Sequence, residues 1–482
     1  MSEDQIVEPK LLRGFRDYLP AQMNARRMMI DTIRTVYESY GFLPLETPAL
    51  EYHVTLMGYG EENAKQIFEF QNPEEEHVAL RFDLTAPLAR VVAQYPNLPL
   101  PFRRYQVGPV WRADKPDPGR YREFTQFDLD SVGTSSPAAD TEILCGMHDA
   151  LRALGITEFR VRFSDRNVLN SLMDFASVPH QLAHRVFRVL DKLEKIGLEE
   201  VVAELTSGRV DVSGDKIPGL GLRAGQVSRI KEFLAIPQGQ RREVLARFEA
   251  LFKNVDSARG AIGTLGFICD SLEALGLREE NVALDLSIAR GLEYYTGPVF
   301  EAVLTNAPEF GSVFGGGRYD GLVERFLGRK VPAVGASIGV DRLFAALEAL
   351  GLVDAVSSTA KVLVTVMEQT KITEYQIITR ELRSAGINTE LYLGQEKNLG
   401  KQLQYADRLG IPVAVIIGSD EFARGEVTVK NLKLGALLQD KKNSPSGKER
   451  EEWLQLSRTV QTSVPRDSVI EHIRNILSER IS

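Results

Sequence analysis

Two strand-like segments joined by a short link most strongly limit how this chain can fold. Residues 102–112, Phe-Arg-Arg-Tyr-Gln-Val-Gly-Pro-Val-Trp-Arg, and residues 122–130, Arg-Glu-Phe-Thr-Gln-Phe-Asp-Leu-Asp, both have the texture of β-strands. Residues 113–121 hold two prolines and one glycine, which is typical of a loop. We therefore predict two antiparallel strands joined by this loop.

One face of this strand pair carries chemistry. Alternate residues of a strand face one side. On the second strand these are Arg122, Phe124 and Gln126, followed by Asp128 and Asp130 if no twist or bulge intervenes. With Arg112 on the first strand, arginines can bind phosphates and Phe124 can stack on a flat base. A surface hairpin held by salt bridges is the alternative, but it does not explain the aromatic residues between the charges.

A second rich stretch is residues 285–300, Asp-Leu-Ser-Ile-Ala-Arg-Gly-Leu-Glu-Tyr-Tyr-Thr-Gly-Pro-Val-Phe. Arg290 offers a five-donor fork that suits phosphate or carboxylate. Tyr294 and Tyr295 combine apolar rings with hydroxyls that can bind a small polar ligand. A tyrosine-rich strand end, with an arginine whose head reaches solvent, is the alternative.

Three further sites have the residue types of a ligand pocket. Asp83 and Thr85 lie where a strand gives way to a helix, as a helix cap or as ligand contacts. Residues 315–322, Gly-Gly-Gly-Arg-Tyr-Asp-Gly-Leu, would let the backbone approach a ligand, although they lack the lysine of a Walker loop. Arg342 falls in the first turn of a predicted helix, where a cation is disfavoured, which suggests an anionic partner.

Cysteine and histidine usage gives no metal motif. Cys145 and Cys269 are far apart and no CxxC occurs, so neither a disulfide framework nor a thiolate zinc site is expected. His180 and His184 have the i, i+4 spacing of a metal pair, but a solvated helix face explains them better. No apolar run of about 18 residues or signal-like N-terminus is seen, so a cytoplasmic location is expected.

The length of 482 residues requires several domains. The net charge of −8 argues against a generally cationic nucleic-acid binder. Residues 361–482, however, hold 18 basic and 16 acidic residues, a balance of +2 that is compatible with a polyanionic partner.

Helical spacing dominates from about 167 to 277, with a glycine-rich loop at 208–225. Residues 361–433 alternate between strands and helices, and 440–467 are expected to form an exposed excursion.

Near the N-terminus, residues 23–40 have the pattern of an amphipathic helix. Residues 42–51, which follow it, look like a short strand that carries Pro48. Such a pair suits a dimer interface, with an ordinary edge strand as the alternative.

These motifs together resemble the class II aminoacyl-tRNA synthetases, and specifically the histidyl-tRNA synthetase family. Residues 290–295 and 315–322 are similar to that family's two signatures. Residues 102–130 are similar to class II motif 2, and 339–342 to motif 3. The helix with Pro48 is similar to motif 1. The resemblance spans about residues 9–433.

The resemblance implies an α/β multidomain chain: an antiparallel-sheet class II catalytic domain with a helical insertion, followed by a C-terminal α/β anticodon-binding domain. The expected domains are 1–166 and 278–356 for the two catalytic parts, 167–277 for the insertion, and 361–482 for anticodon binding. The implied partners are L-histidine, ATP, tRNA(His) and a second copy of the chain, with no membrane. Magnesium would arrive with ATP, and no protein-bound zinc is expected.

The resemblance also assigns roles to residues. Arg112 and Arg290 would be catalytic and neutralise the α-phosphate. The ATP contacts would be Arg112, Arg120, Arg122, Phe124 and Arg342. The histidine contacts would be Asp83, Thr85 and Gln126 for the ammonium and carboxylate, and Asp130, Tyr295 and either Tyr319 or Tyr294 for the imidazole.

The chain departs from the family's usual pattern in its motif 2 loop. It has Asp114-Lys-Pro-Asp117-Pro-Gly-Arg120 where Glu-Arg-Pro-Gln usually precedes the Gly-Arg pair. Members of the family usually depend on an extra 5′ guanylate of their tRNA, and this loop is expected to meet the tRNA acceptor end. Altered recognition of that guanylate is therefore a hypothesis.

Two other functions compete with the ligase. One is a catalytically inactive synthetase-like regulatory subunit of ATP phosphoribosyltransferase. The other is a synthetase-like sensor of uncharged tRNA.

Overall fold

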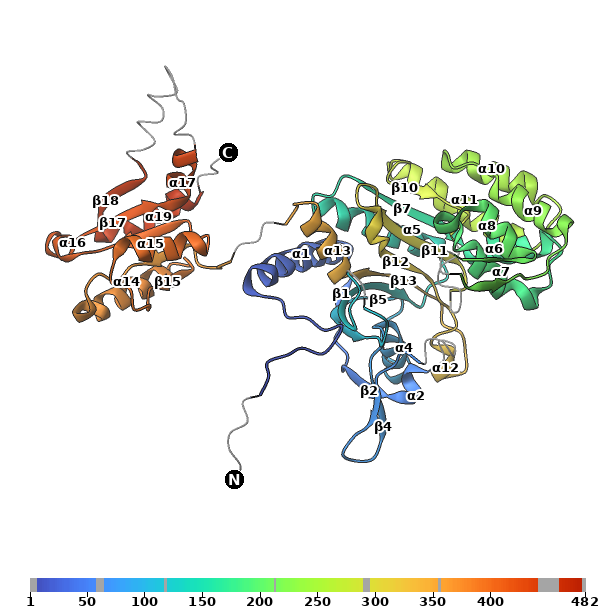
Figure 1. The fold of residues 1–482 in the computed structure, drawn as a ribbon, viewed down its shortest axis with the longest axis horizontal. Coiled ribbons are helices and arrows are strands. Elements are labelled where there is room, and N and C mark those ends of the chain that lie inside the picture. The colour runs from blue at the N-terminus through green and yellow to red at the C-terminus, as the bar shows by residue number, and fades with distance from the viewer. Residues whose placement is uncertain are drawn as a thin grey trace, which may run out of the picture. The chain divides into compact units, whose positions relative to one another are not determined.

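The computed structural model describes residues 7–57, 65–116, 119–211, 214–288, 295–353, 357–440 and 459–478. The chain divides into two compact units (Figure 1). The larger unit is built mainly on Met29–Val353 and the smaller mainly on Asp354–Ser482. In the described residues, no helix is long and apolar enough to cross a membrane.

An eight-stranded sheet forms the centre of the larger unit. Its strand order is β1-β5-β6-β13-β12-β11-β7-β10. All neighbours from β5 to β7 pair antiparallel, whereas β1 joins β5 and β10 joins β7 in parallel. The bounds are β1 Leu43–Pro44, β5 Phe102–Trp111, β6 Glu123–Val132, β7 Phe159–Asp165, β10 Val282–Leu284, β11 Pro298–Leu304, β12 Ser312–Arg318 and β13 Ala333–Gly339. The predicted hairpin is present as β5 and β6, and the predicted α/β class with an antiparallel sheet is confirmed.

Helices pack against this sheet because each buries one apolar stripe. Helix α5 contacts β13 and β7, and α13 contacts β6. Helix α1 buries Met29, Ile33 and Tyr37. The bounds are α1 Pro20–Ser39, α5 Pro137–Ala153 and α13 Val340–Ala349.

Residues 166–274 are mainly helical, and in Figure 1 the helices α6 to α10 gather beside β7 and β10. The bounds are α6 Arg166–Phe175, η1 His180–Leu182, α7 Ala183–Leu190, α8 Leu193–Leu205, α9 Ala224–Leu234, α10 Arg241–Leu251 and α11 Ala258–Ala274. Phe252 holds the helices together, its ring lying 4.8 Å from Phe175 and 4.5 Å from Phe248.

In the larger unit, two expectations about strands are wrong. Residues 208–225 are not only a loop, because β8 (Gly208–Val210) and β9 (Lys216–Pro218) pair as a hairpin. Gly208 makes this possible, since its φ of +91° suits glycine and a Cβ there would overlap the carbonyl oxygen of Ile217.

The segment 42–51 is two strands rather than one. Its first part is β1, and its second is β2 (Leu50–Tyr52) in a separate three-stranded sheet of order β2-β4-β3. Pro48 lies between them, where no strand ladder needs its missing N–H. The other bounds are α2 His53–Leu56, β3 Glu69–Gln71, β4 His77–Leu80, α4 Thr85–Gln94, η2 Pro308–Phe310 and α12 Glu324–Leu327.

The smaller unit is a five-stranded mixed sheet of order β15-β14-β16-β17-β18. Its apolar core includes Val362, Val364 and Tyr375, whose hydroxyl donates to the carbonyl oxygen of Ile417 at 2.7 Å. The strands are β14 Val362–Val364, β15 Thr389–Leu391, β16 Val413–Ile416, β17 Glu426–Asn431 and β18 Gln461–Pro465. The helices are η3 Gln369–Lys371, α14 Ile372–Ser384, α15 Leu399–Arg408, α16 Ser419–Arg424, α17 Leu432–Asp440, η5 Arg466–Ser468 and α19 Val469–Ser478.

The expected excursion over 440–467 is therefore wrong at its end, because β18 pairs with β17. Residues 441–458 lie outside the described residues.

Candidate active site

The register of three neighbouring strands gathers polar side chains on one face of the large sheet. Across β5 and β6, Arg104 pairs with Asp130 and Gln106 pairs with Asp128. Across β6 and β13, Ser337 pairs with Asp128. Since alternate residues share a face, Gln126 lies on the same side as these groups. The hairpin is thus a polar platform at the centre of the sheet.

This platform holds a buried charge cluster. Arg104 is 0% exposed, and its Nη2 lies 2.9 Å from Asp130 Oδ2 and 3.5 Å from Asp128 Oδ2. The same Nη2 donates to the carbonyl oxygen of Leu84 at 3.2 Å, just before α4. Burial raises the pKa of Asp128 to about 7. The negative charges of Asp130 and Asp83 also raise this pKa, whereas the positive charge of Arg104 lowers it. The site therefore favours an added positive charge.

Several buried polar atoms of the platform have no hydrogen-bond partner among the described residues. They are Nε and Nη1 of Arg104, Oε1 of Gln106, Oε1 of Gln126 and Oδ1 of Asp128. Buried polar groups are nearly always paired, so such a cluster needs an explanation. Both donors and acceptors are present, which suits a small ligand that carries both kinds of group.

Asp130 is held in one orientation from two sides. The Tyr319 hydroxyl donates to Asp130 Oδ1, and burial raises the pKa of this tyrosine well above its ordinary value, with Asp130 adding to the effect. A Cβ at Gly335 would overlap the Asp130 carboxylate, so only glycine fits there. Burial also raises the pKa of Asp130, against Arg104 and the Tyr319 hydrogen bond.

Asp83 and Thr85 border the same face. Asp83 Oδ1 accepts from the backbone N–H groups of Thr85 at 3.1 Å and Ala86 at 2.9 Å, so it caps α4. Asp83 is 7% exposed, and its carboxylate is close enough to raise the pKa of both Asp128 and Asp130. The cap and the ligand-contact interpretations are therefore compatible.

A cavity of about 300 Å³ lies at the N-terminal end of β6. It is lined by residues that include Arg112, Arg120, Phe124 and Arg342. The Arg112 guanidinium lies 4.2 Å from the centre of the Phe82 ring and 5.2 Å from that of Phe124, and its Nε donates to the carbonyl oxygen of Phe82 at 3.1 Å. These contacts fix a planar cation at one wall of the cavity.

The other predicted ATP contacts differ in their surroundings. Arg342 Nη1 donates to the carbonyl oxygen of Ser312 at 2.8 Å. Arg120 forms a two-point ion pair with Asp114 Oδ2 at 2.6 and 3.0 Å. Arg122 is not among the residues that line the cavity, and its Nε donates to the Asp114 carbonyl oxygen at 3.1 Å.

Some predicted site residues cannot be compared with the structure. Arg290 and Tyr294 lie outside the described residues, as does Asp117 in the loop. Tyr295 is described and packs in an apolar cluster that also holds Tyr319.

The expectation that the glycine run 315–317 lets the backbone approach a ligand is wrong for two of its three glycines. A Cβ at Gly316 would overlap the backbone of Gly335, and one at Gly317 would lie 2.8 Å from the Tyr295 ring. These two glycines serve strand packing, and only Gly315 of the run lines the cavity.

Sequence reasoning missed Arg104. Its signal was the alternation of Arg104 and Gln106 on β5, but their partners depend on the register with β6.

The raised pKa of Asp128 makes a prediction about stability. Its folded-state pKa of about 7 is above the ordinary value near 3.9, so the ligand-free protein should lose stability as pH rises from about 4 to 7. Asp128→Asn should make this decline shallower and raise the free energy of unfolding by about 1–3 kcal/mol at pH 8. Denaturant unfolding at pH 5.5 and 8 would measure it. An equal decline in both proteins would contradict the assignment.

Comparisons with known proteins agree with the geometry. A family model described as histidyl-tRNA synthetase matches residues 14–343, and one described as an anticodon binding domain matches 361–445. The chain is 44% identical to a histidine–tRNA ligase of Paracoccus denitrificans (strain Pd 1222), over 99% of this chain and 100% of the relative. It is 40% identical to that of Bradyrhizobium diazoefficiens, over 98% and 97%.

Solved structures are also similar. The crystal structure of histidyl-tRNA synthetase from Nostoc sp. PCC 7120 is 31% identical with a TM-score of 0.81, covering 98% of this chain and 100% of that one. A structure described as an ATP phosphoribosyltransferase regulatory subunit/histidyl-tRNA synthetase from Bacillus halodurans C is 25% identical with a TM-score of 0.68, covering 83% and 97%.

Proposed function

Because the chain belongs to the histidyl-tRNA synthetase family and is a histidine–tRNA ligase, we propose that the platform and its cavity activate histidine with ATP. In the first step a carboxylate oxygen of histidine attacks the α-phosphorus, the bond to the β-phosphate breaks, and pyrophosphate leaves. In the second, a terminal hydroxyl of tRNA attacks the carbonyl carbon and AMP leaves.

The first step needs positioning and charge neutralisation rather than a base. The attacking carboxylate is already ionised at neutral pH. Arg112 would stabilise the negative charge that develops on the α-phosphate, together with Arg290. Phe124 would stack on adenine, and Arg120, Arg122 and Arg342 would bind phosphates. The fixed position of the Arg112 guanidinium against Phe82 supports its part.

The observation that carries the proposal is the set of buried, unsatisfied polar atoms on Arg104, Gln126 and Asp128 among the described residues. A zwitterionic amino acid supplies the missing partners. Asp83, Thr85 and Gln126 would hold the ammonium and carboxylate, while Asp130, Tyr319 and Tyr295 would bind the imidazole, with Tyr294 as a further candidate. An imidazole offers one donor and one acceptor at opposite nitrogens, so side chains that lack them leave buried groups unpaired.

Magnesium would be held mainly by the phosphates of ATP. The carboxylates that line the described part of the cavity are Asp114 and Asp341. Asp114 accepts from Arg120, and Asp341 Oδ2 accepts from the Thr125 N–H at 2.5 Å. This donor set fits an ion that arrives with its nucleotide, since Mg²⁺ keeps several waters and prefers few protein ligands.

The regulatory-subunit alternative is not favoured. The relatives that match the whole length of the chain are named ligases, and the anticodon-binding unit is present. Two of the arginines expected to bind ATP, Arg112 and Arg342, are also present and line the cavity.

A homodimer is part of the proposal. Support comes from the likeness to class II motif 1 and from the exposed Leu43 on β1, at the edge of the sheet. Sedimentation equilibrium showing a monomer at micromolar concentration would contradict it. A cytoplasmic location stays a prediction.

Amino-acid-dependent exchange of pyrophosphate into ATP tests the activation step. Purified enzyme with histidine should exchange rapidly, and glutamine or phenylalanine should support at least about 10⁴-fold slower exchange. Equal exchange with several amino acids would contradict the proposed pocket.

The loop that begins at Asp114 supports a prediction about tRNA. Charging of tRNA(His) transcripts with and without the extra 5′ guanylate should differ less than about tenfold, or 1.4 kcal/mol. The physical reason is the negative charge of Asp117, which stands where the family's usual pattern has a neutral amide, because a carboxylate repels phosphates. Asp117→Gln should increase the dependence, with exchange as the control for folding. Strong dependence of charging on the extra 5′ guanylate in the unaltered enzyme would contradict this prediction.

A further inference from the structure

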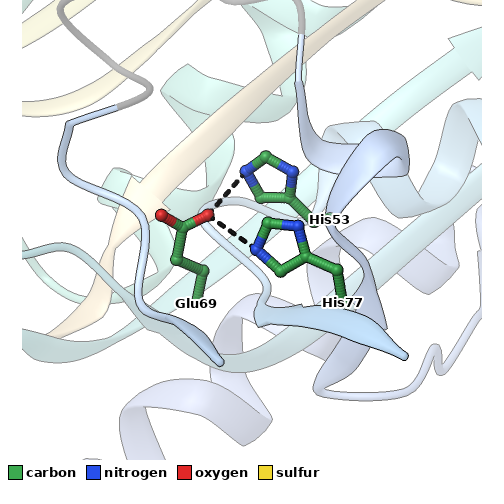
Figure 2. Close-up of side chains that lie close together, drawn as sticks. All are labelled: His53, Glu69 and His77. Carbon is green, nitrogen blue, oxygen red and sulfur yellow. Dashed lines mark hydrogen bonds and ion pairs between the residues drawn. The ribbon is translucent and has the colours of Figure 1, made fainter. Parts of the chain in front are cut away.

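Three side chains away from the active-site cavity converge on one point (Figure 2). His53 begins α2, Glu69 lies on β3 and His77 lies on β4. Both imidazoles direct Nε2 to the same carboxylate oxygen, Glu69 Oε2, at 2.8 Å from His53 and 3.0 Å from His77. The two rings are stacked, with centroids 4.2 Å apart and planes 19° from parallel.

The small sheet fixes these positions. Leu50 pairs with Leu80 and Tyr52 with Val78, so the next step of the ladder brings His53 opposite His77. On the other side of β4, Gln71 pairs with His77, which leaves Glu69 diagonal to it. Diagonal neighbours on one face of a sheet are within reach of long side chains. The cluster is therefore held by backbone pairing on both sides.

The donor set is that of a transition-metal site. Two imidazole nitrogens and one carboxylate oxygen are common ligands of zinc and related ions. The three ligand atoms all lie within 4.8 Å of one another. An ion with tetrahedral bonds of about 2.0–2.2 Å would separate its ligands by about 3.3–3.6 Å, so the two histidine–glutamate distances of 2.8 and 3.0 Å need only a small expansion. We propose that His53, Glu69 and His77 bind one Zn²⁺-like divalent ion, with water in the remaining positions.

The surroundings of the cluster favour a cation. Residues 69–77 include four glutamates and no lysine or arginine. Glu76 is oriented by the Tyr52 hydroxyl at 2.8 Å and by Asn72 Nδ2 at 2.9 Å. A histidine hydrogen-bonded to a carboxylate is the simpler alternative, as in His180 with Asp174 at 2.8 Å. That arrangement needs one imidazole, whereas here two rings present the same nitrogen to one oxygen.

The bound ion would join three separate elements. It would tie the start of α2 to the β3–β4 hairpin through side chains that are 21% exposed for His53, 48% for Glu69 and 52% for His77. An ion that binds only the folded chain raises its thermal stability. The site would therefore be structural, and it does not depend on the cysteines.

Titration of the full-length, chelator-treated protein tests the site. Zn²⁺ followed by calorimetry should bind with one tight site per chain, and Co²⁺ should give the visible absorption of a site with nitrogen ligands. His53→Ala and His77→Ala should each weaken binding at least about 100-fold, because loss of a ligand exceeds the 10–100-fold effect of outer contacts. Zn²⁺ should raise the melting temperature of the unaltered protein but not of these variants.

His180→Ala is the matched control, since it removes an imidazole from a carboxylate pair without touching the cluster. It should bind Zn²⁺ as the unaltered protein does. Histidine-dependent pyrophosphate exchange in all variants reports that the chain is folded. The proposal is overturned if no tight site is found. It is also overturned if His53→Ala and His77→Ala bind Zn²⁺ with the affinity of the unaltered protein.

Discussion

Replacing Arg112 with alanine is expected to slow histidine-dependent pyrophosphate exchange by about 10²–10⁴-fold, the range for removing one cation or donor that acts on transition-state charge. The guanidinium lines the cavity and is fixed by the Phe82 ring, the Phe124 ring and the Phe82 carbonyl oxygen. Most of the loss should appear in kcat rather than in KM for ATP, because the charge develops during the reaction. Steady-state exchange at varied ATP measures both.

Two further variants separate this role from a general loss of charge. Arg112→Lys keeps the cation but loses the planar fork, so it should recover only part of the rate. Arg152→Ala removes an exposed cation on α5, away from the cavity lining, and should exchange normally. A rate for Arg112→Ala within about threefold of the control would exclude Arg112 from catalysis.

The second large effect concerns Arg104. Arg104→Met should lower the free energy of unfolding of the larger unit by about 3–5 kcal/mol, because it leaves Asp128 and Asp130 buried without their cation. Denaturant unfolding followed by the fluorescence of Trp111, on β5, measures the change. Histidine binding should weaken as well, since Arg104 orients the Asp130 carboxylate.

A double variant tests the cause. Arg104→Met with Asp128→Asn removes the cation and one of the acids, so it should regain part of the lost stability. If Asp128→Asn adds no more stability to the Arg104→Met variant than it adds to the unaltered protein, the loss comes from packing and not from buried charge.

The hairpin and the shared face of its polar residues could be predicted from sequence because the signals are local. Alternation along residues 122–130 places Phe124, Gln126 and Asp130 on one face, and the β6 register agrees with this. The cavity likewise gathers Arg112, Phe124 and Arg342, which motif resemblance had grouped.

What could not be predicted depends on contacts between distant segments. The role of Arg104 depends on its position opposite Asp130, and the need for glycine at 316 depends on the backbone of Gly335. The cluster at His53 joins three elements with no recognisable spacing in the sequence. The continuous apolar pattern of segment 42–51 predicts one strand, whereas the chain passes from one sheet to another there.

Transfer of radiolabelled histidine to tRNA tests the central claim most directly. Purified enzyme, ATP, Mg²⁺ and unfractionated bacterial tRNA should give acid-precipitable, base-labile histidyl-tRNA, and no other labelled amino acid should be attached. The product should be lost with Arg112→Ala and kept with Arg152→Ala. Folded enzyme at micromolar concentration that attaches no histidine to tRNA would contradict the account.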